Sequence, residues 1–485
     1  MKAGSAAQAI RENISGKTGK QALAFGGKWR SWDWLRGFCA AVDDAAGAAD
    51  HVALVARNRP QHVAVMAAGL AARRSTTMIH AAQGAEALAR AIRALDCTAI
   101  FADAQDWSAR ALAAAAEIGA WAVAIEDCPG GVRIVQQGQP SGRPETLTDF
   151  AFSLLSSGTT GPPKSMPISW ATLDAAAGDA TTTYAGSGAE APILMLHPLG
   201  GVSGLSYVVP SLVRGQAIVL FEKFNAAEWA EAVRLYRPVR SALPAAALQM
   251  VMDAGVDAAD LASLTLVAVG GSRLEPDLQD AFEARYGIPV LTAYGATEFG
   301  GVIATWPLDL YRQWGKAKRG SCGRAVANVE IRIVGEASGA ALPHGEVGLL
   351  EARVGRVGPD WIRTNDLASL DADGFLYAHG RADGAINRGG FKVVPDMVAR
   401  ALALHPAVAE AAVVGKADAR LGEVPVAAVE LAPGQSASGE ELREWLRGHL
   451  LAYQVPAQII ALDRLPRTES MKVCLAEVRA LFAGD

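Results

Sequence analysis

The stretch Ser156-Ser157-Gly158-Thr159-Thr160-Gly161-Pro162-Pro163-Lys164 directly follows a short apolar run, Phe152-Ser153-Leu154-Leu155. The apolar run predicts a strand, so a strand opens here into a loop of hydroxyl groups, glycines and one lysine. Glycines allow sharp turns that bring backbone N–H groups close to an anion. Hydroxyl groups and an ammonium can bind the oxygens of a polyphosphate. The loop is therefore predicted to bind nucleotide phosphates, with an ordinary polar surface loop as the alternative.

This loop differs from the common phosphate loop, G-x-x-x-x-G-K-[ST], in which a glycine directly precedes the lysine. Here Pro163 precedes Lys164, and Pro162 stands before it. Two adjacent prolines disfavour a helix that starts at this point. We therefore expect no helix N-terminus to carry the phosphates.

The composition is that of an ordinary globular protein, with 51% apolar and 20% charged residues in a chain of 485. This length predicts roughly three domains, or one large domain and a smaller one. The net charge of −5 is small, and the basic cluster at 316–319 is short, so no nucleic-acid-binding surface is expected.

The cysteines are few and scattered, which argues against a disulfide framework or a zinc site and fits a reducing compartment. They are Cys39, Cys97, Cys128, Cys322 and Cys474. No run of about 18 apolar residues and no secretory signal is visible, so we expect no membrane span and a cytoplasmic location.

Short apolar runs alternate with alanine-rich helical stretches through the first two thirds of the chain. The predicted strands are 51–55, 98–101, 121–125, 192–196, 217–221, 264–269 and 289–293, and the predicted helices include 60–73 and 105–118. Repeated strand–helix units predict an α/β fold with parallel sheets covered by helices. Such sheets bind ligands beyond the carboxyl ends of their strands.

From about residue 325 the pattern changes to alternating apolar and polar residues. Residues 329–334 and 347–354 predict antiparallel strands of a small β-barrel-like sheet. After a charged, glycine-flanked joint, helices near 395–404 and 439–450 alternate with strands at 409–414, 424–431 and 457–462. We predict a large N-terminal domain (1–380), a hinge (381–383) and a smaller, mobile α+β domain (384–485).

Further motifs follow the phosphate loop in a fixed order. They are Gly270-Gly271-Ser272, Tyr294-Gly295-Ala296-Thr297-Glu298, Trp361-Ile362-Arg363-Thr364-Asn365-Asp366, Gly380-Arg381, Ala452-Tyr453-Gln454-Val455-Pro456 and Leu465-Pro466-Arg467-Thr468-Glu469-Ser470-Met471-Lys472. Over nearly the whole chain, this set resembles the adenylate-forming superfamily of acyl-CoA synthetases, firefly-type luciferases and nonribosomal peptide adenylation domains. The closest type is the acyl-CoA synthetases.

The resemblance implies a reaction in two halves. A carboxylate attacks the α-phosphorus of ATP, which releases pyrophosphate and gives an acyl adenylate. A thiol, commonly that of coenzyme A, then displaces AMP and forms a thioester. Attack at phosphorus builds negative charge, so such a site needs hydrogen-bond donors and cations more than a nucleophile of its own.

The resemblance also implies roles for particular residues. Ser156, Thr159, Thr160 and Lys164 would hold the β- and γ-phosphates within a loop completed by Ser157, Gly158 and Gly161. Thr297 would donate to the α-phosphate, and Glu298 would bind Mg²⁺, which suits carboxylate and phosphate oxygens. A solvated surface acid is the alternative for Glu298.

For the nucleoside, Tyr294, Gly295 and the backbone at Gly270, Gly271 and Ser272 would flank adenine. Asp366 would accept both ribose hydroxyls, and Arg381 would donate to the ribose or a phosphate. The alternatives are a core tyrosine for Tyr294 and, for Asp366 with Arg381, a salt bridge that braces the joint.

Lys472 would be the adenylation lysine, which neutralises the approaching carboxylate and α-phosphate. An exposed lysine near the end of the chain is the alternative. The resemblance places the hinge at Asp383, and it places Gly389, Gly390, Phe391 and Lys392 toward the entering thiol.

The acid pocket is predicted around His197, Gly200, Gly201, Ala296 and Phe299, where small and apolar residues favour an apolar acid. The sequence departs from the family pattern at Gly201, where many relatives carry histidine. Asn365 and Met471 replace glycines before Asp366 and Lys472. For His197 a core or surface histidine is the alternative to a pocket role.

Together these features predict an acid:CoA ligase that uses ATP, Mg²⁺ and coenzyme A to activate an aromatic or medium-chain fatty acid. One alternative is transfer of the acyl group to a separate acyl carrier protein. Another is a nucleotide-binding homologue without catalysis. The partners would be a small-molecule carboxylic acid and CoA, with no nucleic acid, and a homodimer is left open.

Overall fold

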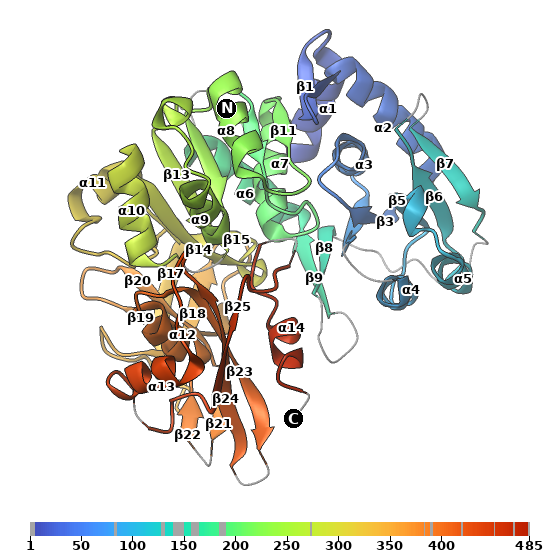
Figure 1. Ribbon diagram of the computed structural model, residues 1–485. Helices are drawn as coiled ribbons and strands as arrows, with labels where there is room; N and C mark the ends of the chain where they lie inside the picture. The colour runs from blue at the N-terminus through green and yellow to red at the C-terminus, as the bar shows by residue number, and fades with distance from the viewer. Residues whose placement is uncertain are drawn as a thin grey trace. The chain divides into compact units, whose positions relative to one another are not determined.

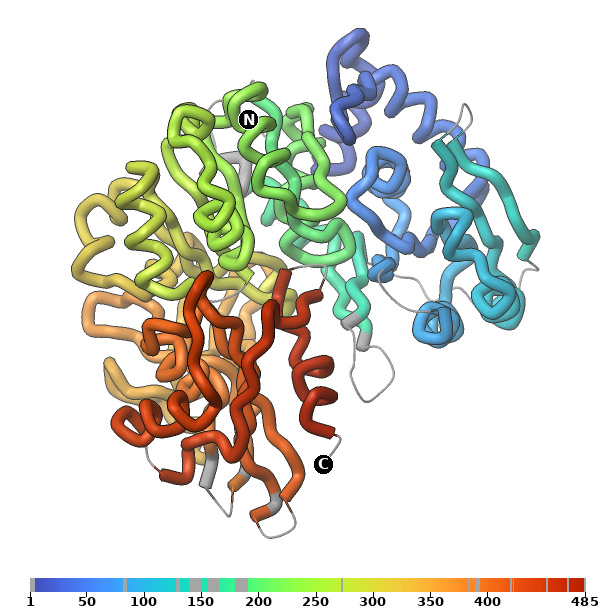
Figure 2. Tube along the Cα trace, in the orientation of Figure 1, coloured from blue at the N-terminus to red at the C-terminus, as the bar shows by residue number. Residues whose placement is uncertain are grey.

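The computed structural model of the chain describes residues 5–81, 85–127, 131–138, 150–156, 164–183, 191–271, 274–382, 384–388, 391–418, 421–450, 452–468 and 471–483 (Figure 1). The chain forms two compact units, and Figure 2 traces its backbone. Unit 1 comprises residues 1–303 with 356–358, and unit 2 comprises 304–355 with 359–485. The predicted hinge residue Asp383 lies outside the described residues, so the domain division at 381–383 stays a prediction.

Unit 1 contains a sheet in the order β7-β6-β5-β3-β4-β8-β9. Its strands are β3 (His51–Ala56), β4 (Ser75–His80), β5 (Ala99–Asp103), β6 (Trp121–Ile125), β7 (Val132–Gln136), β8 (Phe150–Ser156) and β9 (Lys164–Ser169). The central pairs are parallel, and the outer strands β7 and β9 are antiparallel to their neighbours. The predicted parallel sheet is therefore confirmed.

Alternate residues of β3 face different helices. Val52 and Leu54 share a core with α2 (Trp32–Ala46) and α3 (Pro60–Ala71), whereas Ala53 and Val55 share one with α4 (Ala85–Arg93) and α5 (Ala109–Glu117). Both faces of the strand are thus buried, which explains its continuous apolar sequence.

Two of the predicted helices are shorter than expected, for local reasons. The helix expected at 60–73 ends at Ala71, because Arg73 adopts a left-handed backbone with φ of 56°. The helix expected at 105–118 begins only at Ala109, where the Ser108 hydroxyl caps it and accepts from the Ala111 N–H. Residues 104–106 form a 3-10 turn instead.

A second sheet of unit 1, β10-β11-β1-β2, joins distant parts of the chain. Its strands are β1 (Gln21–Phe25), β2 (Lys28–Ser31), β10 (Ile193–Met195) and β11 (Ile218–Leu220). β1 is parallel to β11, with Leu23 opposite Ile218. The helices nearby in the chain are α1 (Ala6–Gly16), α6 (Trp170–Thr183), α7 (Val202–Arg214) and α8 (Ala226–Tyr236).

The third sheet begins in unit 1 with the parallel neighbours β12 (Arg240–Leu243), β13 (Leu266–Gly270) and β14 (Val290–Ala296). The helices α9 (Ala245–Asp253) and α10 (Pro276–Tyr286) connect these strands. β15 (Gly301–Thr305) runs into unit 2, where Ala304 pairs with Ala325 of β16 (Arg324–Ala325).

Unit 2 contains two further sheets. The helix α11 (Leu308–Trp314) precedes an antiparallel meander of β17 (Val329–Val334), β18 (Gly348–Val354), β19 (Trp361–Leu370) and β20 (Leu376–Arg381). The other sheet, β22-β21-β24-β23 with β25 beside β24, has α12 (Pro395–Ala403), α13 (Gly439–Arg447) and α14 (Leu475–Ala480) in the same part of the chain. Its strands are β21 (Ile386–Arg388), β22 (Phe391–Val393), β23 (Val408–Asp418), β24 (Gly422–Leu431) and β25 (Gln458–Leu462).

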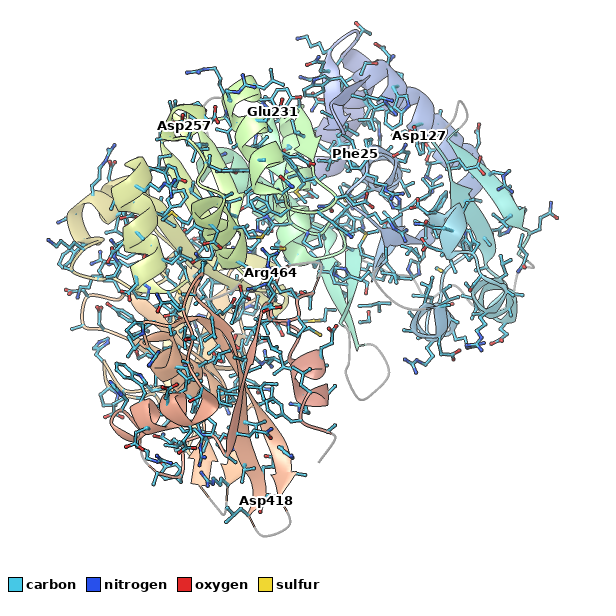
Figure 3. All side chains as sticks on the ribbon, viewed as in Figure 1. Phe25, Asp127, Glu231, Asp257, Asp418 and Arg464 are labelled. Atoms are coloured by element: carbon cyan, nitrogen blue, oxygen red, sulfur yellow. The ribbon has the colours of Figure 1, made fainter. Side chains whose placement is uncertain are left out.

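The strand expected at 409–414 is longer than predicted. Backbone pairing between β23 and β24 continues past the polar residue Lys416 to Asp418, which Figure 3 labels. Cross-strand hydrogen bonds thus extend the strand beyond its apolar run. In the part of the chain described above, no helix is both long and apolar enough to cross a membrane.

Candidate active site

The predicted phosphate loop joins two antiparallel strands. β8 ends at Ser156 and β9 begins at Lys164, and these two residues are opposite each other in the sheet. Lys164 therefore starts a strand rather than a helix, as the prolines indicated. The residues between them, which include Ser157, Gly158, Thr159, Thr160 and Gly161, lie outside the described residues, as do the side chains of Ser156 and Lys164.

The groups predicted to flank adenine lie at the carboxyl ends of two parallel neighbours, β13 and β14. Gly270, the last residue of β13, is opposite Ala293, so Tyr294 lies one residue further along the same edge. Gly271 has φ of 77°, in the region that favours glycine. A Cβ on Gly295 would lie 2.5 Å from the Gly301 carbonyl oxygen, so the backbones approach closely there. Ser272 lies outside the described residues.

The predicted phosphate and metal ligands follow β14 directly. Thr297, Glu298 and Phe299 form a short 3-10 turn after Ala296. Thr297 is half-buried and Glu298 is exposed, so the carboxylate is open to a hydrated cation. Phe299 is fully buried, and its place in the acid pocket stays a prediction.

The residues present fit Mg²⁺ bound together with a substrate. In the described ranges no three His, Cys, Asp or Glu side chains gather into a metal site. Mg²⁺ keeps several waters and often takes only one or two protein carboxylates together with substrate phosphates. An exposed Glu298 beside the Thr297 hydroxyl meets that requirement.

The predicted acid-pocket segment follows β10. His197 is buried, and its ring stacks on Tyr207 with centroids 5.1 Å apart and planes inclined by 27°. A Cβ on Gly200 would meet Ala56 Cβ at 3.5 Å and the His80 ring at 3.7 Å, and both are ordinary contacts. A methyl group at 200 would therefore fit against His80, whereas one at Gly201 would lie 3.6 Å from the Pro198 carbonyl oxygen.

Sequence reasoning missed His80 and Tyr207 as neighbours of this segment. His80 is the last residue of β4, and Tyr207 lies on α7. β4 is parallel to β8, so the end of β4 lies at the same sheet edge as the phosphate loop. The rule that ligands bind at carboxyl ends could have indicated His80.

In unit 2, the predicted ribose ligands are cross-strand neighbours. Asp366 of β19 is opposite Arg381 of β20, and Arg381 Nη1 lies 3.5 Å from Asp366 Oδ1. The Arg381 side chain is 56% exposed and that of Asp366 is 20% exposed. A long, exposed ion pair of this kind contributes little to the stability of the fold. Both side chains can therefore also bind a ligand.

Lys472 lies on a tight loop. The Thr468 N–H donates to the Lys472 carbonyl at 2.8 Å, and the Met471 N–H donates to the Thr468 carbonyl at 2.9 Å. Arg467 and Val473 form an antiparallel bridge that closes the loop. Met471, which replaces the family glycine, has φ of 63° and so occupies a backbone region that glycine adopts more easily.

The ammonium of Lys472 lies close enough to Asp366 for their charges to interact. Desolvation lowers the pKa of Lys472 below its ordinary value, and the Asp366 charge opposes that shift. The residue as a whole is exposed. The structure thus brings together two predicted site residues that are more than a hundred positions apart.

Gly380 and the predicted thiol-facing residues lie in the same unit. Gly380 has φ of 110°, a backbone region that favours glycine, and a Cβ there would lie 2.4 Å from Oδ2 of the Asp396 side chain on α12. Arg388 pairs with Phe391 across β21 and β22. Gly389 and Gly390 lie outside the described residues, as do the side chains of Phe391 and Lys392.

Two family models match the chain. One, described as AMP-binding enzyme, matches residues 19–355, and the other, AMP-binding enzyme C-terminal domain, matches residues 398–472. An indoleacetate–CoA ligase from Aromatoleum aromaticum is 33% identical over 345 residues. The match covers 67% of this chain and 66% of that enzyme, which is just under two thirds of its length.

Solved structures match nearly the full length. ATP-bound MatB from Rhodopseudomonas palustris has a TM-score of 0.83 at 20% identity, over 99% of both chains, which shows a shared fold. The amide bond synthetase McbA from Marinactinospora thermotolerans has a TM-score of 0.80 at 26% identity, over 98% of this chain and 99% of that one.

Proposed function

Because this chain belongs to the AMP-binding enzyme family, we propose that it is an ATP- and Mg²⁺-dependent acid:CoA ligase. The observation that carries the proposal is the match of both family models, and the cross-strand pair of Asp366 and Arg381 supports it. In the proposed site these two residues bind the nucleotide, and Lys472 supplies the cation that attack on its α-phosphate requires.

In the first half-reaction the acid's carboxylate approaches a phosphate that is itself negatively charged. Lys472 lies between the two groups and neutralises both, which removes a repulsion that is strong away from water. Asp366 and Arg381 hold the ribose and fix the nucleotide relative to that cation.

Glu298 and Thr297 hold the metal and the α-phosphate at the end of β14. A metal held by Glu298 would supply positive charge that neutralises the phosphates. The hydroxyls and the lysine of the 156–164 loop bind the β- and γ-phosphates.

In the second half-reaction a thiol displaces AMP from the acyl adenylate. Lys472 is not needed for this second half-reaction. Rotation at Asp383 moves the C-terminal domain, and Lys472 with it, away from the nucleotide. The segment from Gly389 to Lys392 then faces the thiol of coenzyme A.

The acid is apolar and aromatic. Gly200, Gly201 and Ala296 offer no charge to a second polar group, and the stacked rings of His197 and Tyr207 belong to the same segment and its neighbouring helix. The relative that acts on indoleacetate supports a flat aromatic acid as the first substrate to try. A medium-chain fatty acid is the alternative.

After the same first half-reaction, two other groups could accept the acyl group in place of coenzyme A. One is the pantetheine of a separate acyl carrier protein. The other is an amine, which the full-length likeness to an amide bond synthetase supports. A nucleotide-binding protein without catalysis is disfavoured because Glu298, Asp366, Arg381 and Lys472 are all present.

The test begins with acid-dependent exchange between ATP and pyrophosphate. Arylacetic, cinnamic and medium-chain fatty acids form the panel, with an amino acid and a dicarboxylic acid as polar controls. Active acids are then supplied with coenzyme A, a phosphopantetheinylated carrier protein or a simple amine. Exchange with no acid in the panel would refute the proposal, and a product formed only with carrier protein or amine would replace CoA as the acceptor.

A further inference from the structure

Asn58 makes hydrogen bonds in three directions from the turn between β3 and α3. It is 6% exposed. Its Nδ2 donates to the His197 carbonyl at 3.0 Å and to the Phe221 carbonyl at 3.1 Å, and its Oδ1 accepts from the Leu199 N–H at 2.8 Å. One buried amide therefore holds two backbone positions of the acid-pocket segment 197–201 and a third just after β11.

The residues on both sides of Asn58 fix this turn firmly. Arg57 pairs with Asp106, with Nη2 2.7 Å from Oδ1, and with Asp103 at 3.1 Å. Arg59 pairs with Asp103 at 2.9 Å and with Glu222 at 2.7 Å. The Arg57 and Asp103 side chains are only 15% and 11% exposed, so these pairs are partly protected from solvent.

A buried histidine, His62, also helps to hold the turn that carries Asn58. The Arg57 N–H donates to His62 Nδ1 at 3.3 Å, so the other ring nitrogen, Nε2, carries the hydrogen that Asp103 Oδ1 accepts at 2.9 Å. Although burial alone would raise the pKa of Asp103, this hydrogen bond and the two arginines hold it below its ordinary value. Asp103 therefore stays ionised and keeps the turn in place.

The side chains of this segment are held by the buried Leu199 and by the His197–Tyr207 stack, whereas Asn58 holds its backbone. Gly200 and Gly201 carry no side chains, and glycine leaves the backbone more freedom than other residues do. A Cβ on Gly204 would lie 2.2 Å from the Pro198 carbonyl oxygen, so α7 also limits the segment, but only from its far end. Asn58 thus makes direct hydrogen bonds to the backbone at both 197 and 199.

We propose that Asn58 is a positioning residue that sets where the segment His197–Gly201 lies, and through it the shape of the acid pocket. The inference rests on the proposed function for the identity of that pocket. The contacts of Asn58 stand independently of that function.

The side-chain amide of Asn58 supplies both a donor and an acceptor, so the test variants are chosen by which of these they remove. Asn58→Ala leaves two carbonyls and one N–H without this partner in the interior. Asn58→Asp keeps the shape and the acceptor, but it places a carboxylate against two carbonyl oxygens. Asn13 is the matched control, because its Nδ2 also donates to two carbonyls, Leu212 at 3.0 Å and Val213 at 2.9 Å, at the other end of α7.

Hydrogen exchange tests the positioning without any need for activity. The Leu199 N–H should be protected in the wild-type protein and should exchange about tenfold faster or more in Asn58→Ala, since its acceptor is lost. Asn13→Ala should leave it protected. Rapid exchange of Leu199 in the wild type, or equal protection in Asn58→Ala, would overturn the positioning role.

Steady-state kinetics with an acid found active in the exchange assay test the link to the pocket. Asn58→Ala and Asn58→Asp should raise KM for the acid about tenfold and leave KM for ATP within about twofold. Asn13→Ala should change neither KM. If Leu199 becomes exposed to exchange while KM for the acid is unchanged, the segment does not shape the acid pocket and the inference fails. Absence of any acid-dependent exchange in the wild type would instead refute the proposed function.

Discussion

Arg467 should position the loop that carries Lys472, and Arg467→Ala should therefore slow adenylation more than thioester formation. Its Nη1 donates to the Met471 carbonyl at 3.2 Å. Its Nη2 pairs closely with Glu410 and lies 3.8 Å from Glu430. Through these contacts one guanidinium joins the lysine loop to the long strands β23 and β24.

The expected loss of adenylation rate in Arg467→Ala can be estimated from the solvent exposure of its contacts. The Arg467 side chain is 23% exposed and that of Glu410 is 39% exposed, so screening limits their ion pair to less than about 1 kcal/mol. The hydrogen bond to the Met471 carbonyl contributes about 1 kcal/mol. A loss of about 1.4 kcal/mol in the placement of Lys472 corresponds to about a tenfold lower rate.

The assay compares the two half-reactions. ATP–pyrophosphate exchange measures adenylation, and thioester formation from a supplied acyl adenylate measures the second half. Arg464→Ala is the control, because Arg464 is exposed, belongs to the same segment and carries the same charge (Figure 3). Arg467→Lys keeps the charge without the planar fork and should recover only part of the rate.

The refuting results are specific. If Arg467→Ala and Arg464→Ala lower ATP–pyrophosphate exchange equally, Arg467 acts only through its positive charge and does not position the loop. If Arg467→Ala lowers the rates of adenylation and thioester formation equally, Arg467 does not act through the loop that carries Lys472.

Other expected outcomes concern the same loop and the anchored turn. Lys472→Ala should lower pyrophosphate exchange about 10²-fold or more and spare thioester formation from a supplied adenylate, because one electrostatic stabiliser of the first half is lost. Met471→Gly should change the free energy of unfolding by less than about 1 kcal/mol, since relief of the left-handed backbone is offset by greater unfolded-chain entropy. Met471→Val should lower that free energy clearly in chemical denaturation. The low pKa of Asp103 stabilises the fold above its ordinary value of about 3.9, and this contribution is lost as pH falls through the lower folded-state pKa. Thermal unfolding of Asp103→Asn should accordingly depend less on pH below about pH 4 than that of the wild type.

The strands of the parallel sheets could be read from the sequence because both of their faces are buried. A continuous apolar run such as His51–Ala56 carries that information locally. The pairing of β1 with β11 could not be read, because Leu23 and Ile218 meet only after nearly two hundred residues of chain have folded between them. The helix expected to reach residue 73 ends at Ala71, since the left-handed residue Arg73 outweighs an apolar pattern that continues, and the helix expected to reach residue 450 ends at Arg447.

The same distinction applies to the site. Motif residues such as Asp366 and Lys472 were identified by resemblance, and the structure brings them together within unit 2. Asn58, His80 and Tyr207 were missed, because their significance lies in contacts with a segment far away in the chain. The hydrogen bond between Asn58 and the His197 carbonyl spans 139 positions. No local pattern marks an asparagine for that role.

The contacts around Lys472 also indicate that its placement is cooperative. In unit 2, the segment before the predicted hinge meets the segment after it at Gly380 and Asp396, and Arg400 donates to the His379 carbonyl at 3.2 Å. The interaction of Asp366 with Lys472 joins the same two segments. A rotation at Asp383 that withdraws Lys472 must therefore break the contacts of α12 with β20 as well. If the segment after the predicted hinge moves as one body, these contacts form and break together, so we predict that Lys472 is either held beside Asp366 by all of them or released by all of them. This argues for two discrete positions of the C-terminal segment, one for each half-reaction, rather than a continuous range.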